Sequence, residues 1–207
     1  MPKTLYLIDG HALAYRAYFA MLTTGSRFQT TSGEPTAATF GFTNILMSIL
    51  EKDKPDYLAV AFDTGKTFRN DRYPEYKATR AKMPDDLIVQ VERIRQVVDA
   101  FNIPRLEKEG FEADDVLGSV ARQAAEKGLG VKIVTGDRDL LQLVDERIVV
   151  NLAGGKLSEA QDFFAEDVVK KMGVKPSQVV DLKALIGDTS DNIPGVKGIG
   201  EKTAGKL

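Results

Sequence analysis

The sequence TLYLIDG at residues 4–10 carries the pattern that decides the fold: a short apolar run, an aspartate and a glycine. Apolar runs of this length, bounded by turn residues, are typical of buried strands. The pattern returns in YLAVAFD at residues 57–63 and in VKIVTGD at residues 131–137. The sequence therefore predicts three buried strands, each of which ends at or just before a carboxylate.

The segments between these strands have the apolar spacing of helices. Helical periodicity covers residues 38–49, 87–101 and 116–124, and two further strands are expected at residues 103–106 and 148–152. Strands that alternate with helices predict an α/β fold with a mostly parallel sheet and helices on both of its faces.

The composition narrows the possible chemistry. The 207 residues include no cysteine and a single histidine, His11. This excludes a disulfide framework, thiol catalysis and zinc-finger sites. The net charge of −2 does not indicate nucleic-acid binding, so any such indication must come from how the charges are distributed. No apolar run approaches the roughly 20 residues of a membrane span, and the N-terminal run is too short for a signal peptide. We expect a cytoplasmic protein without a membrane partner.

Carboxylates gather at the predicted strand ends. Because the carboxyl ends of parallel strands share one rim of a sheet, we expect these groups to converge. Converging carboxylates repel one another unless a cation lies among them, and oxygen ligands suit Mg²⁺ or Mn²⁺. Each acid alone has a simpler explanation, as a turn residue or as an acid in a first helical turn. Together they predict a site for two divalent cations, and the acids are Asp9, Asp63, Glu112, Asp114, Asp115, Asp137, Asp139, Asp188 and Asp191.

A basic segment at residues 65–84 interrupts the α/β pattern. It contains six lysines and arginines against two acids, with Phe68, Tyr73 and Tyr76 interleaved. It would cover the acidic rim and offer Lys77 and Arg80 to a phosphodiester, which suits metal-assisted displacement at phosphorus by water. The alternative is a solvated loop whose aromatic residues pack on the sheet.

The chain from residue 163 onward has the pattern of short helices, so we place a domain boundary near residue 160. Within it, GDTSDNIPGVKGIGEKTA at residues 187–204 sets Gly198 and Gly200 just before a helix, flanked by Lys197 and Lys202. Small residues beside lysines let backbone amides approach a DNA backbone without reading bases. A plain turn between helices is the alternative.

The chain resembles the 5′ nuclease (flap endonuclease) family. The motifs that carry the resemblance are long and follow one another along the whole chain. They are LIDGHALAYRAYFA (7–20), AFD (61–63), FRNDRYPEYKATR (68–80), FEADDVLG (111–118), VTGDRDLLQLV (134–144) and GDTSDNIPGVKGIGEKTA (187–204).

The resemblance implies a Rossmann-like (PIN-like) core at residues 1–160 with a helical arch near residues 65–84. It also implies a helical DNA-binding region at residues 161–207 with a helix-three-turn-helix element, which often holds a monovalent cation such as K⁺. Asp9, Asp63, Glu112, Asp114 and Asp115 would form a first metal cluster, and Asp137, Asp139, Asp188 and Asp191 a second. Lys77 and Arg80 would be catalytic residues of the arch. The implied DNA contacts are Arg16, Arg69, Tyr76, Lys197, Gly198, Gly200, Lys202 and Thr203.

The activity implied is a structure-specific 5′–3′ exonuclease or flap endonuclease that hydrolyses phosphodiester bonds by two-metal-ion catalysis. Its substrates would be DNA with 5′ flaps or nicks and RNA-primed DNA, in replication and repair. The protein would act as a monomer, or be linked to a polymerase domain in a longer chain. Family members usually continue beyond the last helix of this chain, so a non-catalytic fragment that binds branched DNA is an alternative. A PIN-type ribonuclease is another, although it would need neither the second acidic cluster nor the Gly-rich element.

Overall fold

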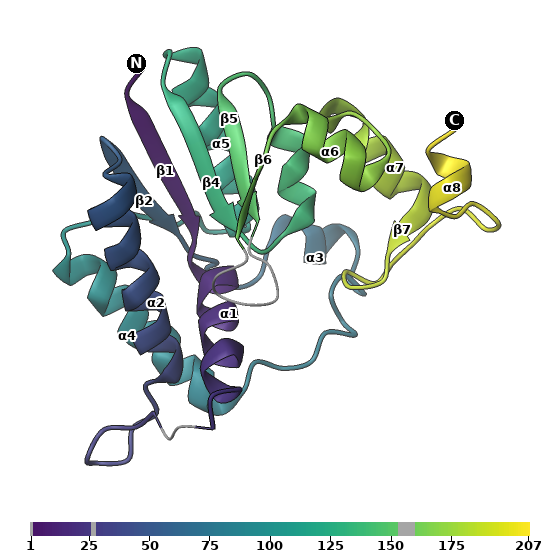
Figure 1. The fold of residues 1–207 in the computed structure, drawn as a ribbon. Helices are drawn as coiled ribbons and strands as arrows, with labels where there is room; N and C mark the ends of the chain where they lie inside the picture. Colours follow the sequence, from purple (N-terminus) through teal and green to yellow (C-terminus); the bar gives the residue numbers. More distant parts are fainter. Residues whose placement is uncertain (1, 26–27, 153–159) are drawn as a thin grey trace.

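The computed structural model describes residues 2–25, 28–152 and 160–207, and a six-stranded sheet forms its centre (Figure 1). Five strands are parallel, and the last pairs antiparallel with its neighbour at one edge. The order across the sheet is β3 (Arg105–Leu106), β2 (Tyr57–Ala61), β1 (Thr4–Asp9), β4 (Gly130–Thr135), β5 (Ile148–Leu152) and β6 (Gln161–Phe163). The predicted mostly parallel α/β sheet is confirmed.

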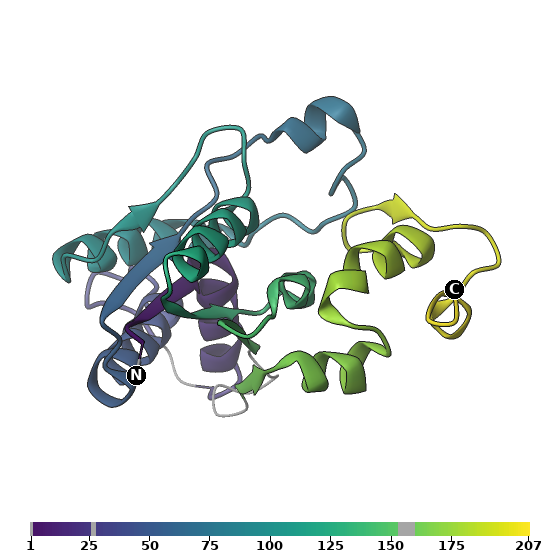
Figure 2. The same ribbon diagram turned by 90° about the horizontal axis from the view of Figure 1, so that it is seen from above.

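Helices cover both faces of the sheet, as seen from above in Figure 2. Successive side chains of a strand point to opposite faces, so Leu7 joins one core while Tyr6 and Ile8 join the other. The core around Leu7 includes α5 (Ala113–Glu126) and the 3₁₀ helix η2 (Arg138–Leu143). The other core includes α1 (Gly10–Leu22), α2 (Ala37–Ser48), which continues into the π-helical turn η1 (Ile49–Asp53), and α4 (Asp85–Ala100).

The strand order reverses between β1 and β4. Parallel α/β sheets bind ligands beyond the carboxyl ends of their strands at such a switch point. The chain turns sharply there, because α1 begins immediately after β1 at Gly10. A Cβ atom on Gly10 would lie 2.4 Å from the ring of Phe62, so only glycine lets α1 start this close to the end of β2.

The C-terminal segment packs beside the sheet and extends away from it (Figure 1). It contains α6 (Ala165–Met172), the 3₁₀ turn η3 (Pro176–Gln178), α7 (Val179–Ile186) and α8 (Glu201–Ala204). A small hairpin of β7 (Gly187–Asp188) and β8 (Ile193–Pro194), which the sequence did not predict, joins α7 to the last loop. The boundary predicted near residue 160 adjoins residues 153–159, outside the described residues, and the chain after it enters the sheet as β6 before it becomes helical.

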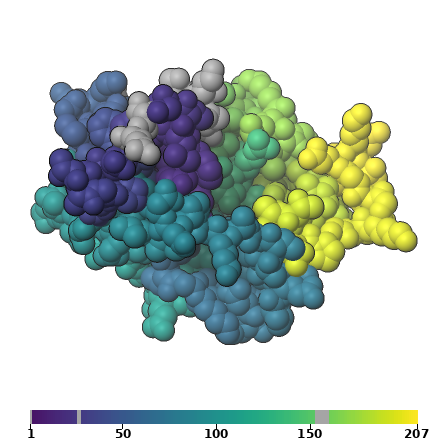
Figure 3. Space-filling view, turned by 90° about the horizontal axis from the view of Figure 1, so that it is seen from below, coloured from purple at the N-terminus to yellow at the C-terminus, as the bar shows by residue number. Residues whose placement is uncertain are grey.

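The segment predicted as an arch contains one short helix, α3 (Phe68–Arg72), followed by turns and extended chain. Residues 73–80, which we call the strap, cross the carboxyl end of the sheet and reach the C-terminal segment. On the face seen in Figure 3, the blue strap and the yellow C-terminal segment lie against each other. Within the described ranges, no helix has the length and apolar character needed to cross a membrane.

Candidate active site

A pocket of about 940 Å³ opens at the carboxyl ends of β1, β2 and β4. The strap separates it from a second pocket, and the two share Lys77, Glu112 and Asp137 among their lining residues. We call the first the rim pocket. Of the nine predicted carboxylates, only Asp115 lines the second pocket alone. The eight that line the rim pocket are Asp9, Asp63, Glu112, Asp114, Asp137, Asp139, Asp188 and Asp191.

Asp9 lies at the end of β1 in the switch-point crevice. Its side chain accepts hydrogen bonds from the amide of Ala12 at 2.9 Å and from the hydroxyl of Thr135 at 2.9 Å, so it joins β1, α1 and β4. It is 6 % exposed. Burial raises the pKa of Asp9 from 3.8 to about 6, against the opposing effect of these hydrogen bonds.

Asp63 follows β2, and its carboxylate accepts a hydrogen bond from the amide of Ala113 at 2.8 Å. The carboxylate also lies 3.4 Å from Nδ1 of His11. That nitrogen accepts a hydrogen bond from the backbone amide of Asp63, and burial lowers the pKa of His11. The imidazole is therefore neutral and does not neutralise Asp63. Sequence reasoning missed His11 as a lining residue of this pocket, although it follows Asp9 by only two residues at the end of β1.

Asp114 has the most perturbed carboxylate of the pocket. Among the described residues, no hydrogen bond or ion pair holds its side chain. Burial, followed by repulsion from Asp9, Asp137 and Asp63, raises the pKa of Asp114 from 3.8 to about 8. A carboxylate in this condition is stabilised by any cation that enters beside it.

The strap places its basic residues directly on the acids. Lys77 Nζ lies 2.7 Å from Glu112 Oε1, and Arg80 makes an ion pair of 2.5 Å with Asp191. The Lys77 amide also donates to the backbone carbonyl of Asp191 at 2.9 Å. Lys77 adopts a φ of 58°, a left-handed conformation that is uncommon for lysine and is often found at functional sites. Both predicted catalytic residues thus reach the rim pocket, where they neutralise carboxylates.

Two predicted DNA contacts are occupied by protein groups. The guanidinium of Arg69 makes a bidentate pair with Asp115, with N–O distances of 2.6 and 2.7 Å. The hydroxyl of Tyr76 lies 3.0 Å from carboxylate oxygens of both Glu112 and Asp191. Because Tyr76 is only 7 % exposed, its ring is not open to a base in this conformation.

The second predicted cluster lies on η2 and at the hairpin. Asp137 accepts a hydrogen bond from the amide of Asp139 at 2.8 Å and so begins η2. Asp139 and Asp188 are bridged by Lys183 of α7, with Nζ–O distances of 2.8 and 2.7 Å. Sequence reasoning missed Lys183, although it precedes Asp188 by only five residues. The need for positive charge at this cluster was the one signal that pointed to such a residue.

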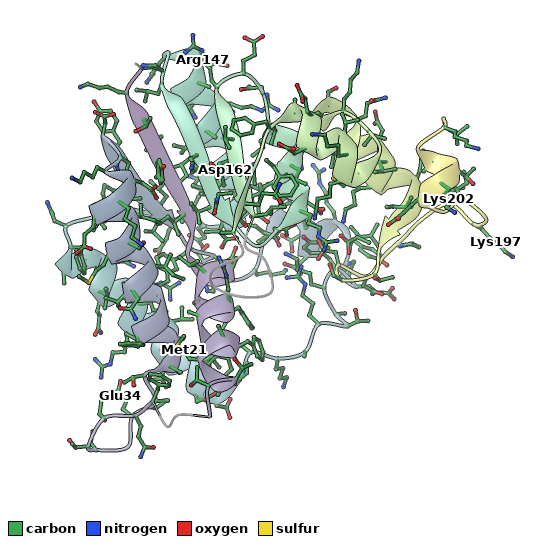
Figure 4. The ribbon with its side chains drawn as sticks, viewed as in Figure 1. Met21, Glu34, Arg147, Asp162, Lys197 and Lys202 are labelled. Atoms are coloured by element: carbon green, nitrogen blue, oxygen red, sulfur yellow. The ribbon has the colours of Figure 1, made fainter. Side chains whose placement is uncertain are left out.

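The remaining predicted DNA contacts lie away from the rim pocket. Arg16 lines a separate pocket with Tyr6 and Lys132 on the α1–α2 side of the sheet. Lys197 and Lys202 lie at the far end of the C-terminal segment and extend into solvent (Figure 4). Gly198 has a φ of 85°, which glycine adopts without strain. This lysine-bearing end consists of Lys197, Gly198, Gly200, Lys202 and Thr203.

The donor set fits divalent cations, since the rim pocket offers hard carboxylate oxygens and contains carboxylates with raised pKa values. Nevertheless, among the described residues no three acids or histidines lie close enough together to hold an ion as they stand. The separation of these acids is explained in part by their ion pairs, because five of them are directed toward lysine or arginine side chains. Those acids are Glu112, Asp115, Asp139, Asp188 and Asp191.

Comparison with known proteins gives two adjoining family matches. Residues 4–173 match the model described as 5′-3′ exonuclease, N-terminal resolvase-like domain, and residues 174–207 match the C-terminal SAM fold of the 5′-3′ exonuclease. DNA polymerase I of Chloroflexus aurantiacus is 55% identical over 204 residues, which cover 97% of this chain and 21% of that protein. DNA polymerase I of Bacillus subtilis is 45% identical over 206 residues, which cover 99% of this chain and 23% of that protein. The chain thus spans about a fifth to a quarter of the length of these relatives.

Solved structures agree on the fold. The T5 5′-exonuclease with bound zinc superposes with a TM-score of 0.75 at 24% identity, covering 99% of this chain and 74% of that one. The catalytic core of Rad2 in complex with DNA substrate gives a TM-score of 0.60 at 18% identity, covering 99% and 59%. At these identities the likeness concerns the arrangement of helices and strands.

Proposed function

Because this chain belongs to the 5′-3′ exonuclease family, we propose that it is a metal-dependent nuclease that cuts DNA near 5′ ends and at 5′ flaps. The observation that carries the proposal is the pair of carboxylates at the switch point, the buried Asp9 and the half-buried Asp114. Their raised pKa values mark a place where carboxylates crowd together without an internal cation. Such a place suits divalent cations, with Mg²⁺ or Mn²⁺ as the candidates.

The nine carboxylates would hold two divalent ions, some of them through water. Bound there, such ions polarise a phosphodiester and lower the pKa of an attacking water. The chain's own residues would place the substrate. With divalent ions held by Glu112 and Asp191, Lys77 and Arg80 would be free to face the phosphate from the strap. Asp9 stays fixed by Ala12 and Thr135, which keeps this ligand in place as the strap moves.

The lysine-bearing end of the C-terminal segment would contact the backbone of duplex DNA, because its glycines expose backbone amides beside Lys197 and Lys202. The resemblance adds a K⁺ ion at this turn. The substrates proposed are DNA with 5′ flaps or nicks and RNA-primed DNA. They would be cut by the chain as a monomer or linked to a polymerase domain, as in its relatives.

Cleavage of a labelled double-flap DNA by the 207-residue chain, with Mg²⁺ and with EDTA, tests the proposal. We expect a metal-dependent cut near the flap junction. The variant Asp137→Ala should lose cleavage while its circular dichroism spectrum stays unchanged. Binding without cleavage in Mg²⁺ and in Mn²⁺ would indicate a DNA-binding module instead, and cleavage by Asp137→Ala at the wild-type rate would contradict the metal assignment.

A further inference from the structure

The rim pocket contains a lysine that comes from outside the strap. Lys183 lies on α7, and its Nζ atom is 2.8 Å from Asp139 Oδ1 and 2.7 Å from Asp188 Oδ2. Its side chain is 29 % exposed. Although burial opposes it, the hydrogen bonds to the two carboxylates raise the pKa of Lys183, so the ammonium stays charged. One internal charge therefore bridges two carboxylates of the second cluster.

Both carboxylate oxygens of Asp188 already accept hydrogen bonds from protein groups. Its Oδ1 atom accepts hydrogen bonds from the amide and the hydroxyl of Ser190 at 2.8 and 2.7 Å, and from the amide of Asp191 at 3.3 Å. These bonds belong to the turn between β7 and β8 and hold the carboxylate in one orientation. The other oxygen, Oδ2, accepts a hydrogen bond of 2.7 Å from Lys183 Nζ. A metal ion cannot reach this oxygen while the ammonium is there, because like charges repel at contact distance.

The carboxylates around β1 are in the opposite condition. Among the described residues, no lysine or arginine makes an ion pair with Asp9, Asp63, Asp114 or Asp137, and the His11 nitrogen beside Asp63 accepts a hydrogen bond from the Asp63 amide. No internal cation compensates the charge of this group, whereas Lys183 compensates part of the charge of Asp139 and Asp188. A first divalent ion therefore gains more by entering the group around β1.

We infer that Lys183 is an internal counter-cation that sets the order of metal binding. The first ion enters among Asp9, Asp63, Asp114 and Asp137, and the second is held at Asp139 and Asp188 only after the Lys183 ammonium has moved away. This inference rests on the proposed metal centre, and it makes Lys183 a positioning residue, because it acts through the carboxylates. Because Lys183 lies on α7, which leads into the hairpin and the lysine-bearing end, the position of α7 would affect the binding of the second ion.

Titration of the chain with Mn²⁺ alone, followed by electron paramagnetic resonance, measures the number and affinity of bound ions without DNA. We expect the wild type to bind one ion at least tenfold more tightly than the second. Lys183→Met should tighten the second ion tenfold or more and leave the first unchanged, whereas Lys183→Arg, which keeps the charge, should behave as the wild type. The matched control is Lys132→Met, since Lys132 is 25 % exposed, pairs with Asp162 at 2.7 Å and lies outside the rim pocket.

A measurement on the wild type makes the test independent of how the variants fold. The Nζ resonance of Lys183, followed by nitrogen-15 nuclear magnetic resonance, should shift with the second equivalent of Mg²⁺ and not with the first. A second-ion affinity that is unchanged or weaker in Lys183→Met, or a Lys183 resonance that ignores the second ion, would overturn the inference and leave the metal centre standing. A wild type that binds no ion would overturn both.

Discussion

Replacing Asp114 by asparagine should stabilise the metal-free protein while abolishing its proposed activity. The pKa of Asp114 is raised from 3.8 to about 8. At pH 7 this rise in pKa lowers the unfolding free energy of the wild type by about 4 kcal/mol, because each pKa unit is worth about 1.4 kcal/mol. Neighbouring carboxylates take up protons together with Asp114, and water screens part of the repulsion. We therefore expect a gain of about 2 kcal/mol.

Thermal unfolding in EDTA at pH 7, followed by circular dichroism, measures this gain. For a chain of this length, about 2 kcal/mol raises the Tm by roughly 4–8 °C. Asp115→Asn is the matched control, because it changes the adjacent residue in the same way. Asp115 is held by Arg69, so its replacement should instead lower the stability by about 1–2 kcal/mol.

The sign of the pH dependence provides a second check. A carboxyl group whose pKa is raised in the folded state contributes its stability below pH 4 and loses it as the pH rises toward 8. The gain of Asp114→Asn over the wild type should therefore grow between pH 4 and pH 8. Excess Mg²⁺ should shrink the gain, because ions that bind the folded wild type stabilise it. An Asp114→Asn protein that melts at or below the wild-type Tm in EDTA at pH 7 would refute the reasoning.

Three further predictions follow from other parts of the molecule. Lys77→Ala should slow single-turnover cleavage of flap DNA about 100-fold while changing its Kd far less, and equal losses in both would make Lys77 a simple phosphate anchor. Gly195→Ala should lower the unfolding free energy by about 1–3 kcal/mol and speed hydrogen exchange in the β7–β8 hairpin, because its Cβ would lie 2.3 Å from the backbone of Ile186. Leu117→Ala, in the fully buried face of α5, should cost about 2–5 kcal/mol in chemical denaturation, and a smaller loss would contradict the packing.

Much of the fold was predictable because its strands are short apolar runs that end at turn residues. The runs at 4–8, 57–62 and 131–135 became β1, β2 and β4, in register and parallel. Their order across the sheet did not follow from these runs, since it depends on which helices pack on which face. The β7–β8 hairpin was missed because two-residue strands leave no periodic pattern, and Gly187 and Gly195 permit it through close backbone contact.

The acids of the candidate site could be predicted from the sequence, but the ion pairs and hydrogen bonds that join them to other residues could not. Strand ends placed Asp9 and Asp63, and the switch point brought them beside Asp114. Pairings such as Arg69 with Asp115 join residues far apart in the chain, and they depend on how the strap folds back over the sheet. No local pattern encodes such a pairing. Arg69 was therefore predicted as a DNA contact, whereas in the structure it pairs with the carboxylate of Asp115.

The rim pocket draws on residues from Asp9 near the start of the chain to Asp191 near its end. A ribosome adds roughly 5–20 residues per second, so on the order of ten to forty seconds separate the synthesis of these two carboxylates. The strands around β1 can pair during that interval and the strap can meet Glu112, but the contacts of the strap with Asp191 and Asn192 form only after the hairpin has emerged. A nascent chain therefore carries Asp139 without its internal counter-cation until α7 has been synthesised, whereas Asp188 emerges after Lys183 and meets its partner at once.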